Sequence, residues 1–349
     1  MPSQRHTAVI WATPRQAALA RAVAEIAGLE LVAAGSPIRG QSGAVASALG
    51  CEPADDLRAA LAGASADAIL ILAAGDFGAA EAPEDARAVA AAASRGVRVL
   101  SLEPVPSNAL DLEPGGWIGG NGEGAGAGPA ASVRTVGLPR LMPVFREAAE
   151  TLAAFGPVRT VLIEHWSAPQ HASLAARLVG AIDLVHWLLA ETESIDAVFV
   201  PGAGGPAKVS ERTLLEYEGD LNAMLRTVDG RSALIAVSNA AARWNLTVTL
   251  LGEQGRLRFF DDGFEWLGPD GAKRDDHRSR TRGSASPDHA ASVIADSVSR
   301  LLDDRLPDPG PLNSGSVLAV AHAAMLSART RHAENPAMIR RMMSVQEGL

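Results

Sequence analysis

The chain has 349 residues, of which 47% are hydrophobic and 20% charged, and its formal net charge is -9. This composition is typical of a globular protein and excludes a largely disordered chain. The acidic balance argues against nucleic acid as the main partner. Cys51 is the only cysteine, which excludes an internal disulfide and a metal site built from several cysteines.

No apolar run reaches the ~20 residues that a membrane helix needs. The first residues, MPSQRHTAVIWATP, contain an apolar stretch of strand length without the pattern of a signal peptide. We therefore expect a cytoplasmic protein that does not bind a membrane, and we identify no metal site.

The first part of the chain alternates apolar strand-length runs with alanine-rich helical stretches. The predicted elements are, in order, strand 7–12, helix 15–27, strand 29–34, helix 55–61, strand 67–73, helix 83–95 and strand 97–102. Continuous apolar runs such as DAILILA are typical of strands that are covered on both faces. This order predicts a parallel, doubly wound sheet with right-handed crossovers.

A glycine-rich segment, residues 115–128, interrupts this pattern. Such a composition is typical of a flexible loop. The sequence leaves open whether it is a tolerated insertion or a functional loop that carries Trp117. A short strand at 133–136 and a helix near 143–154 follow it.

From residue 158 the pattern changes to a succession of strands. After a strand at 159–166 and an amphipathic helix at 173–190, strands are predicted at 197–200, 212–217, 223–228, 233–238, 245–251, 256–260 and 264–267, and closing helices at 288–302 and 313–329. Turn signals such as Asp229-Gly230 separate the hairpins. We expect a mostly antiparallel sheet in a second, α+β domain.

These patterns divide the chain into a Rossmann-like domain, residues 1–140, and an α+β domain, residues 141–349, whose last helices can pack back on the first. The basic stretch 273–282 is interpreted as a solvated loop and Lys208 as a surface residue. Met338, Met342 and Met343 indicate a short terminal helix that docks on a partner or on the body of the protein, and a plain terminal helix is the alternative.

The order of several segments resembles the Gfo/Idh/MocA oxidoreductases. The segments are ADAILILAA, RGVRVLSLEP, LMPVFREAAETLAAFGPVRTV, AIDLVHWLLAE, NLTVTLLGEQGRLRFFDDG and VLAVAHAAMLSART. The resemblance spans nearly the whole chain. It implies an N-terminal Rossmann domain that binds NAD or NADP, a second domain with a large open sheet, and activity on a small sugar-like substrate.

The glycine fingerprint that this resemblance requires is missing. Its three glycines correspond to Trp11, Thr13 and Gln16. An indole at the first position is expected to occupy space near the phosphates, and Pro14 removes an amide donor. Arg15, at the start of the following helix, can still assist the binding of an anion.

The acid that usually binds the ribose hydroxyls corresponds to Ser36. Ser36 and Arg39 would suit a 2′-phosphate, which favours NADP over NAD if either binds. A simple polar turn is the alternative. By position, Glu103 also belongs to the cofactor-binding candidates, because it begins what remains of the family's Glu-Lys-Pro segment, in which the lysine is absent.

The catalytic histidine of the resembling family corresponds to Gly180, and the acid before it to Ala176. Neither side chain can move a proton, although oxidation of an alcohol needs a general base. His165, His171 and Glu103 are the remaining catalytic candidates. For the two histidines, a local hydrogen bond is the alternative interpretation.

Two hypotheses on function follow. In the first, which the loss of residues at separate sites favours, the chain keeps the fold but is degenerate in catalysis and binds a cofactor weakly or not at all. It then acts as a binding, regulatory or assembly subunit, as a homodimer or with a related active subunit. In the second, it is an active NAD(P)-dependent oxidoreductase of a sugar-like substrate with an atypical site.

Overall fold

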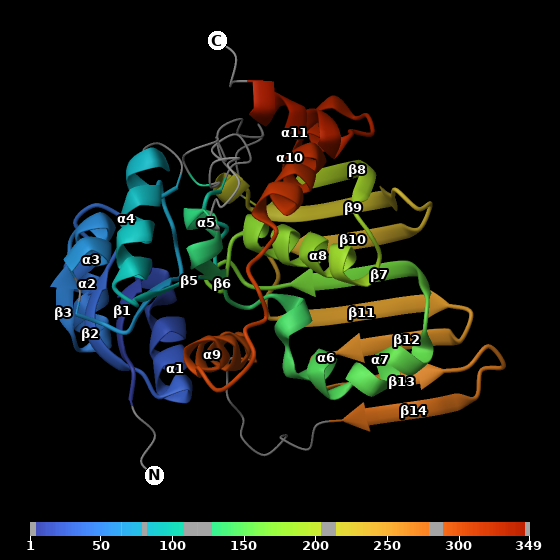
Figure 1. The fold of residues 1–349 in the computed structure, drawn as a ribbon, viewed down its shortest axis with the longest axis horizontal. Coiled ribbons are helices and arrows are strands. Elements are labelled where there is room, and N and C mark those ends of the chain that lie inside the picture. Colours follow the sequence, from blue (N-terminus) through green and yellow to red (C-terminus); the bar gives the residue numbers. More distant parts are fainter. Residues whose placement is uncertain are drawn as a thin grey trace.

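The structure is a computed structural model, and it describes residues 5–63, 65–78, 82–107, 117, 128–203, 214–278 and 289–345. The glycine-rich loop therefore lies outside the described residues except for Trp117 and Gly128, and so does Lys208. The chain forms two sheets that lie next to each other, each with its own helices (Figure 1).

The first sheet is fully parallel and has six strands. Their order is β3 (Glu52–Ala54), β2 (Glu30–Gly35), β1 (Thr7–Trp11), β4 (Ala68–Ile71), β5 (Arg98–Ser101) and β6 (Val133–Thr135). This 3-2-1-4-5-6 order is that of a Rossmann fold. Every residue of β4 is buried, as expected for a strand covered by helices on both faces. The predicted doubly wound sheet is confirmed.

The helices on this sheet are α1 (Ala17–Ala27), α2 (Ser42–Leu49), α3 (Leu57–Gly63) and α4 (Ala82–Ser94), and the four-residue α5 (Pro129–Ser132) precedes β6. Helix α1 ends at Gly28, whose φ of 68° suits glycine at a helix C-terminus. Helix α2 and strand β3 were not predicted from the sequence. Helix α2, SGAVASAL, has no charged residue to mark an outer face, and β3 is an edge strand of three residues.

The second sheet has eight strands and is antiparallel except where β7 pairs with β10. Their order is β14 (Lys273–Arg278), β13 (Gly263–Leu267), β12 (Gly255–Phe260), β11 (Asn245–Gly252), β7 (Val158–Trp166), β10 (Ser232–Ser238), β9 (Gly219–Thr227) and β8 (Thr192–Pro201). The mostly antiparallel sheet is therefore confirmed.

Two local predictions in this region are wrong. Lys273–Arg278 forms the edge strand β14 instead of a loop, because a charged strand is tolerated where one side of it meets solvent. The strand predicted at 212–217 is, where the structure describes it, the short 3-10 helix η4 (Leu214–Glu216).

One face of the large sheet is covered by α6 (Pro143–Glu147), α7 (Ala149–Phe155), α8 (Leu174–Leu188) and α10 (Ser314–Thr330) (Figure 1). Helix α11 (Pro336–Val345) packs on α10, in agreement with the predicted terminal helix. On the opposite face, Met224, Leu234 and Leu162 lie in register on adjacent strands and are exposed.

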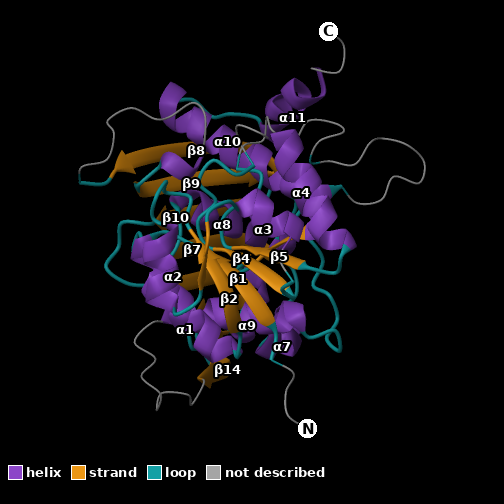
Figure 2. Cartoon of the chain, turned by 90° about the vertical axis from the view of Figure 1, so that its left-hand side faces the viewer, coloured by secondary structure: helices purple, strands orange, loops and turns teal. Residues whose placement is uncertain are grey.

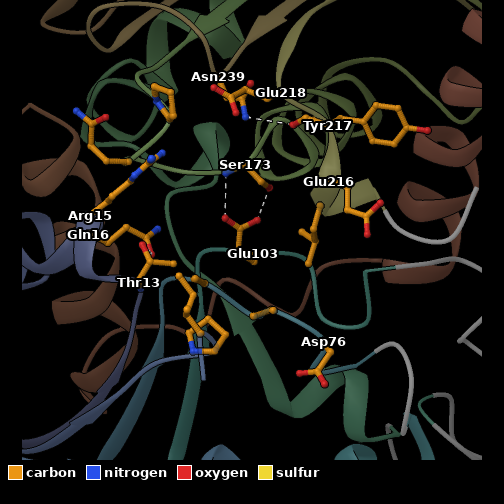
Figure 3. Close-up of a pocket in the computed structure, with 18 residues that line it drawn as sticks. Thr13, Arg15, Gln16, Asp76, Glu103, Ser173, Glu216, Tyr217, Glu218 and Asn239 are labelled. Carbon is orange, nitrogen blue, oxygen red and sulfur yellow. Dashed lines mark hydrogen bonds between the residues drawn. The ribbon is translucent and has the colours of Figure 1, made fainter. Parts of the chain in front are cut away.

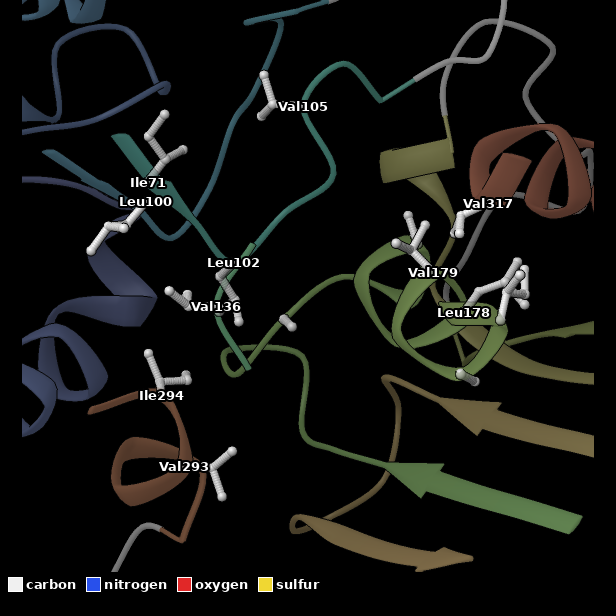
Figure 4. Packing of buried hydrophobic residues seen from close by; sticks show 14 of the residues in the cluster. Ile71, Leu100, Leu102, Val105, Val136, Leu178, Val179, Val293, Ile294 and Val317 are labelled. Atoms are coloured by element: carbon white, nitrogen blue, oxygen red, sulfur yellow. The ribbon is translucent and has the colours of Figure 1, made fainter. Parts of the chain in front are cut away.

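Helix α9 (His289–Leu302) belongs to the second half of the chain but packs on α1 of the first domain. Figure 2, turned by 90°, shows both helices at the same end of the first sheet. In Figure 4, Ile294 of α9 lies close to Leu102 and Val136, while Leu178 and Val317 pack between α8 and α10. The buried cluster therefore extends across both sheets.

Among the described residues, no helix is long and apolar enough to cross a membrane. Within the same residues, no three or more His, Cys, Asp or Glu side chains come together as a metal site would require.

Candidate functional site

A cleft of about 970 Å³ lies between the two domains. From the first domain, the loops that follow β1, β2, β4 and β5 line it. From the second domain it is lined by Pro169, Gln170, Ser173, residues 215–218 and Asn239. Figure 3 shows the labelled side chains around this space. In doubly wound sheets, ligands bind at this carboxyl edge of the strands, so the cleft is the candidate site.

Trp11 does not line the cleft, although it ends β1. Its side chain is 5% exposed and is turned into the core beside β2. A Cβ at Gly35 would lie 2.1 Å from Cζ3 of the indole, so only glycine at that position leaves room for it. The expected obstruction of the phosphate region by Trp11 is therefore wrong.

The loop after β1 is closed by its own side chains. The Thr13 N–H donates to Oε1 of Gln16 (3.0 Å), and the Gln16 N–H donates to the Thr13 carbonyl (2.9 Å). Nε2 of Gln16 donates to the Leu72 carbonyl (2.9 Å) and ties this loop to the next strand. The Thr13 amide is thus not free for a phosphate. Arg15 lines the cleft and is exposed.

The loop after β2 places two of the predicted residues away from the cleft. The Ser36 hydroxyl accepts the Ile38 N–H (3.2 Å) and Ser36 is 5% exposed. Arg39 is exposed and does not line the cleft. Pro37 and Ile38 line it instead, and Gly75 (φ 65°) lets the loop after β4 approach Pro37 closely.

Glu103 lies in the cleft wall where β5 ends, and it is 4% exposed. Oε1 accepts the Ser173 N–H (2.9 Å), and Oε2 accepts the Ser173 hydroxyl. Burial raises the pKa of the Glu103 carboxyl, although these hydrogen bonds and the nearby Arg177 charge oppose that rise. Ser173 is also the N-cap of α8, because its Oγ accepts the Ala176 N–H (3.0 Å).

His165 is fully buried, and it does not line the cleft. Nη1 of Arg177 lies 3.0 Å from Nε2 of His165, Nε of Arg177 donates to the Ser167 hydroxyl (3.0 Å), and the guanidinium lies 4.3 Å from the Trp244 ring centroid. Burial, followed by the charge of Arg177, lowers the pKa of His165 well below its usual value. A neutral His165 therefore accepts from Arg177 inside the domain.

Arg177 was not identified from the sequence. The available signal was one arginine within the apolar helix LAARLVGAI. Burial lowers its pKa to about 9, and Glu103 opposes this shift, so the guanidinium is still charged at neutral pH. His171, the other histidine candidate, is 8% exposed and does not line the cleft.

Gly180, at the position of the family's catalytic histidine, faces Pro139 of the 3-10 helix η3 (Pro139–Leu141). A Cβ at Gly180 would lie 3.0 Å from Cδ of Pro139. One turn later, Asp183 pairs with Arg140 (2.6 Å), and both side chains are nearly buried. This part of α8 therefore packs against η3.

The cleft also contains acidic residues that no sequence motif marked. Asp76, Glu216 and Glu218 are exposed in its wall. Asn239 fixes the nearby backbone, because its Oδ1 accepts the Gly219 N–H (2.9 Å) and its Nδ2 donates to the Tyr217 carbonyl (3.2 Å). In Figure 3, Arg15 lies on the opposite side of the space from Asp76 and Glu216.

No protein-family model matches the chain, and no curated protein matches it. Solved structures do match it over nearly its full length. A putative myo-inositol dehydrogenase from Sinorhizobium meliloti 1021 is 16% identical, with 95% of this chain and 99% of that chain covered and a TM-score of 0.59. An oxidoreductase from Agrobacterium radiobacter, in complex with NAD+, L-tartaric acid and magnesium, is 14% identical, with 96% and 100% covered and a TM-score of 0.64.

A levoglucosan dehydrogenase in complex with NADH and L-sorbose is 13% identical, with 95% of this chain and 99% of that chain covered and a TM-score of 0.63. The matched part, 95–96% of this chain, extends over both sheets. At this level of identity they concern the fold, and function has to be argued from the site. The chain shares the fold of these dehydrogenases and oxidoreductases, with a parallel six-stranded sheet and a mostly antiparallel eight-stranded sheet.

Proposed function

We propose that the chain is an NAD(P)-dependent oxidoreductase that acts on a small polyhydroxylated substrate through an atypical site. The observation that carries this proposal is the open cleft at the carboxyl edge of β1, β2, β4 and β5, where a dinucleotide lies in Rossmann folds. Solved neighbours that contain NAD+ or NADH over the same full-length fold support it. They favour this hypothesis over that of a degenerate subunit.

The residues present fit a dinucleotide with one difference from the usual glycine loop. The space is open because Trp11 is turned into the core, and the close approach of Gly75 to Pro37 keeps the adjoining loops compact. Since Gln16 holds the Thr13 amide, Arg15 is the residue that would hold the phosphates. The nicotinamide would supply the hydride acceptor in this cleft.

Calorimetric titration of the purified protein with NAD+, NADH, NADP+ and NADPH tests the proposal. We expect at least one dissociation constant of about 10 μM or lower, which corresponds to about -7 kcal/mol. Arg15→Ala should weaken that binding by about tenfold or more, because it removes a charge-assisted contact. Arg39→Ala, an exposed arginine outside the cleft, is the matched control and should bind as the wild type does.

Turnover is then measured from the change in nicotinamide absorbance with myo-inositol, levoglucosan, L-sorbose and L-tartrate as probes. Reduction or oxidation of the cofactor with any of them supports an oxidoreductase. Dissociation constants weaker than about 1 mM, or -4.1 kcal/mol, for all four nucleotides would contradict the proposal.

The second candidate is a binding or regulatory subunit without hydride transfer. It is favoured by one observation, namely that among the described residues neither a histidine nor a lysine lines the cleft. At Gly180 even a Cβ would lie 3.0 Å from Cδ of Pro139, so a histidine there requires Pro139 to shift. A polyol that binds the cleft tightly but leaves the nicotinamide absorbance unchanged would support this candidate.

A further inference from the structure

We propose that Glu103, acting together with the Ser173 hydroxyl, accepts the proton of the substrate hydroxyl. This inference rests on the proposed function. Gly180 and Ala176 cannot accept a proton, and the proposal gives this role to Glu103 and Ser173. These two residues are 70 positions apart in the sequence and meet where the two domains touch. Glu103 follows β5 of the first domain, and Ser173 begins α8 of the second.

The position of the pair is the first argument. In Figure 3, Glu103 and Ser173 lie in the middle of the cleft wall, between Arg15 on one side and Glu216 on the other. The two hydrogen bonds from Ser173 hold both carboxylate oxygens in fixed positions. Asp76, Glu216 and Glu218 also line the cleft but are exposed, whereas Glu103 is 4% exposed.

The hydrogen-bonding capacity of Ser173 is the second argument. A serine hydroxyl donates one hydrogen bond and accepts up to two. Its proton goes to Glu103, and one lone pair accepts the Ala176 N–H. One acceptor position on Oγ therefore remains, and a substrate hydroxyl in the cleft can donate to it. Ser173 is half-buried and lines the cleft.

The surroundings of Glu103 are the third argument. Behind it, the Arg177 guanidinium is held by His165 and Ser167 and stabilises the carboxylate form. Burial acts in the opposite direction and raises the pKa of Glu103, which makes its carboxylate a stronger base than an exposed one. His165 is neutral, so Arg177 is the charged side chain that acts directly on Glu103.

Two protons move in the proposed step. The substrate hydroxyl gives its proton to Oγ of Ser173 while the Ser173 proton passes to Oε2 of Glu103. The electron pair of the O–H bond would then form the carbonyl double bond, and a bound oxidised nicotinamide nucleotide would accept the hydride of the adjacent C–H bond. Glu103 later releases the proton to solvent through the cleft.

The test compares wild type, Glu103→Gln, Ser173→Ala and Ser173→Thr with NAD+ or NADP+ and the probe that gives turnover. Glutamine keeps an acceptor for the Ser173 N–H but cannot take a proton. Glu103→Gln should lower kcat by roughly 10²–10⁴-fold, with KM within about threefold, and abolish the fall of kcat/KM at low pH. Ser173→Ala should lose about tenfold or more, and Ser173→Thr, which keeps the hydroxyl, should recover activity relative to Ser173→Ala.

A second measurement does not depend on turnover. Because the folded-state pKa of Glu103 is raised, its carboxylate opposes folding above the unfolded pKa. We therefore compare the melting temperatures of wild type and Glu103→Gln over a range of pH. As the pH rises from the pKa that Glu103 has in the unfolded chain to the higher pKa that it has in the folded protein, the melting temperature of wild type should fall relative to that of the variant. Binding of NADH to Glu103→Gln should stay within about twofold of wild type. Glu25→Gln, an exposed carboxylate on α1, is the matched control and should change neither quantity.

The outcomes are distinguishable. Suppose that wild type turns over a probe, and that Glu103→Gln has the same kcat and the same fall of kcat/KM at low pH. The proton-accepting role is then refuted, while the proposed function stands. If Glu103→Gln loses NADH binding and stability at every pH, Glu103 is a structural cap of α8 and the inference is again refuted. If wild type binds none of the four nucleotides, the proposed function and this role fail together. If it binds a nucleotide but turns over no probe, a melting-temperature difference between wild type and Glu103→Gln that does not change with pH refutes this role alone.

Discussion

Replacing Trp11 by alanine tests whether the indole belongs to the core or to the ligand site. The side chain is 5% exposed and packs beside Gly35. A tryptophan buries roughly 150–250 Å², which at about 25 cal/mol per Å² gives an upper estimate of about 4–6 kcal/mol. Measured truncations of large aromatic side chains cost about 3–5 kcal/mol. We therefore expect Trp11→Ala to lower the free energy of unfolding by about 4 kcal/mol.

Thermal unfolding and urea titration measure this change, which corresponds to a lowering of Tm by about 8–16 °C if the affected unit behaves as a domain of about 150–250 residues. Trp187→Ala, a tryptophan with 47% exposure, is the matched control and should cost much less. Because Trp11 does not line the cleft, nucleotide affinity measured well below Tm should be unchanged. A Trp11→Ala protein of wild-type stability that binds nucleotide more weakly would refute this reasoning.

Two further predictions concern the second domain. The exposed row Met224, Leu234 and Leu162 should be covered by a second copy of the chain. Light scattering should therefore show a dimer that Leu234→Glu converts to a monomer, and a wild type that is monomeric across micromolar concentrations would contradict this. Arg140→Leu should destabilise the protein by about 3 kcal/mol or more at pH 7, because Asp183 is left charged in a nearly buried place. Burial raises the pKa of Asp183 against the effect of Arg140, so denaturant titration at lower pH, where Asp183 is protonated, should show a smaller loss.

The order of elements in the first domain was predictable from the sequence for a local reason. A run such as AILI is apolar on both faces of a strand, and α1 ends at Gly28, so these segments carry their own signals. Helix α2, strand β3 and the charged edge strand β14 carry weak or contrary signals. The two strands are held by tertiary pairing, β14 with β13 and β3 with β2.

Part of the candidate site was also predictable from the sequence. The sequence was sufficient to show that the glycines and the catalytic histidine of the resembling family are absent, because each loss is a matter of residue identity. It also placed Thr13, Arg15 and Glu103 at the ends of strands, where a ligand site was expected, and all three line the cleft.

Only the tertiary structure decided how the other side chains are used. The direction of Trp11 depends on the space that Gly35 leaves on the neighbouring strand. Arg177 is buried because His165, Ser167 and Trp244 surround it, and they come from parts of the chain that no short-range pattern connects. Likewise, Glu103 meets Ser173 only because the two domains pack against each other. Contacts between distant residues depend on the complete packing of both sheets, so the sequence pattern alone does not contain them.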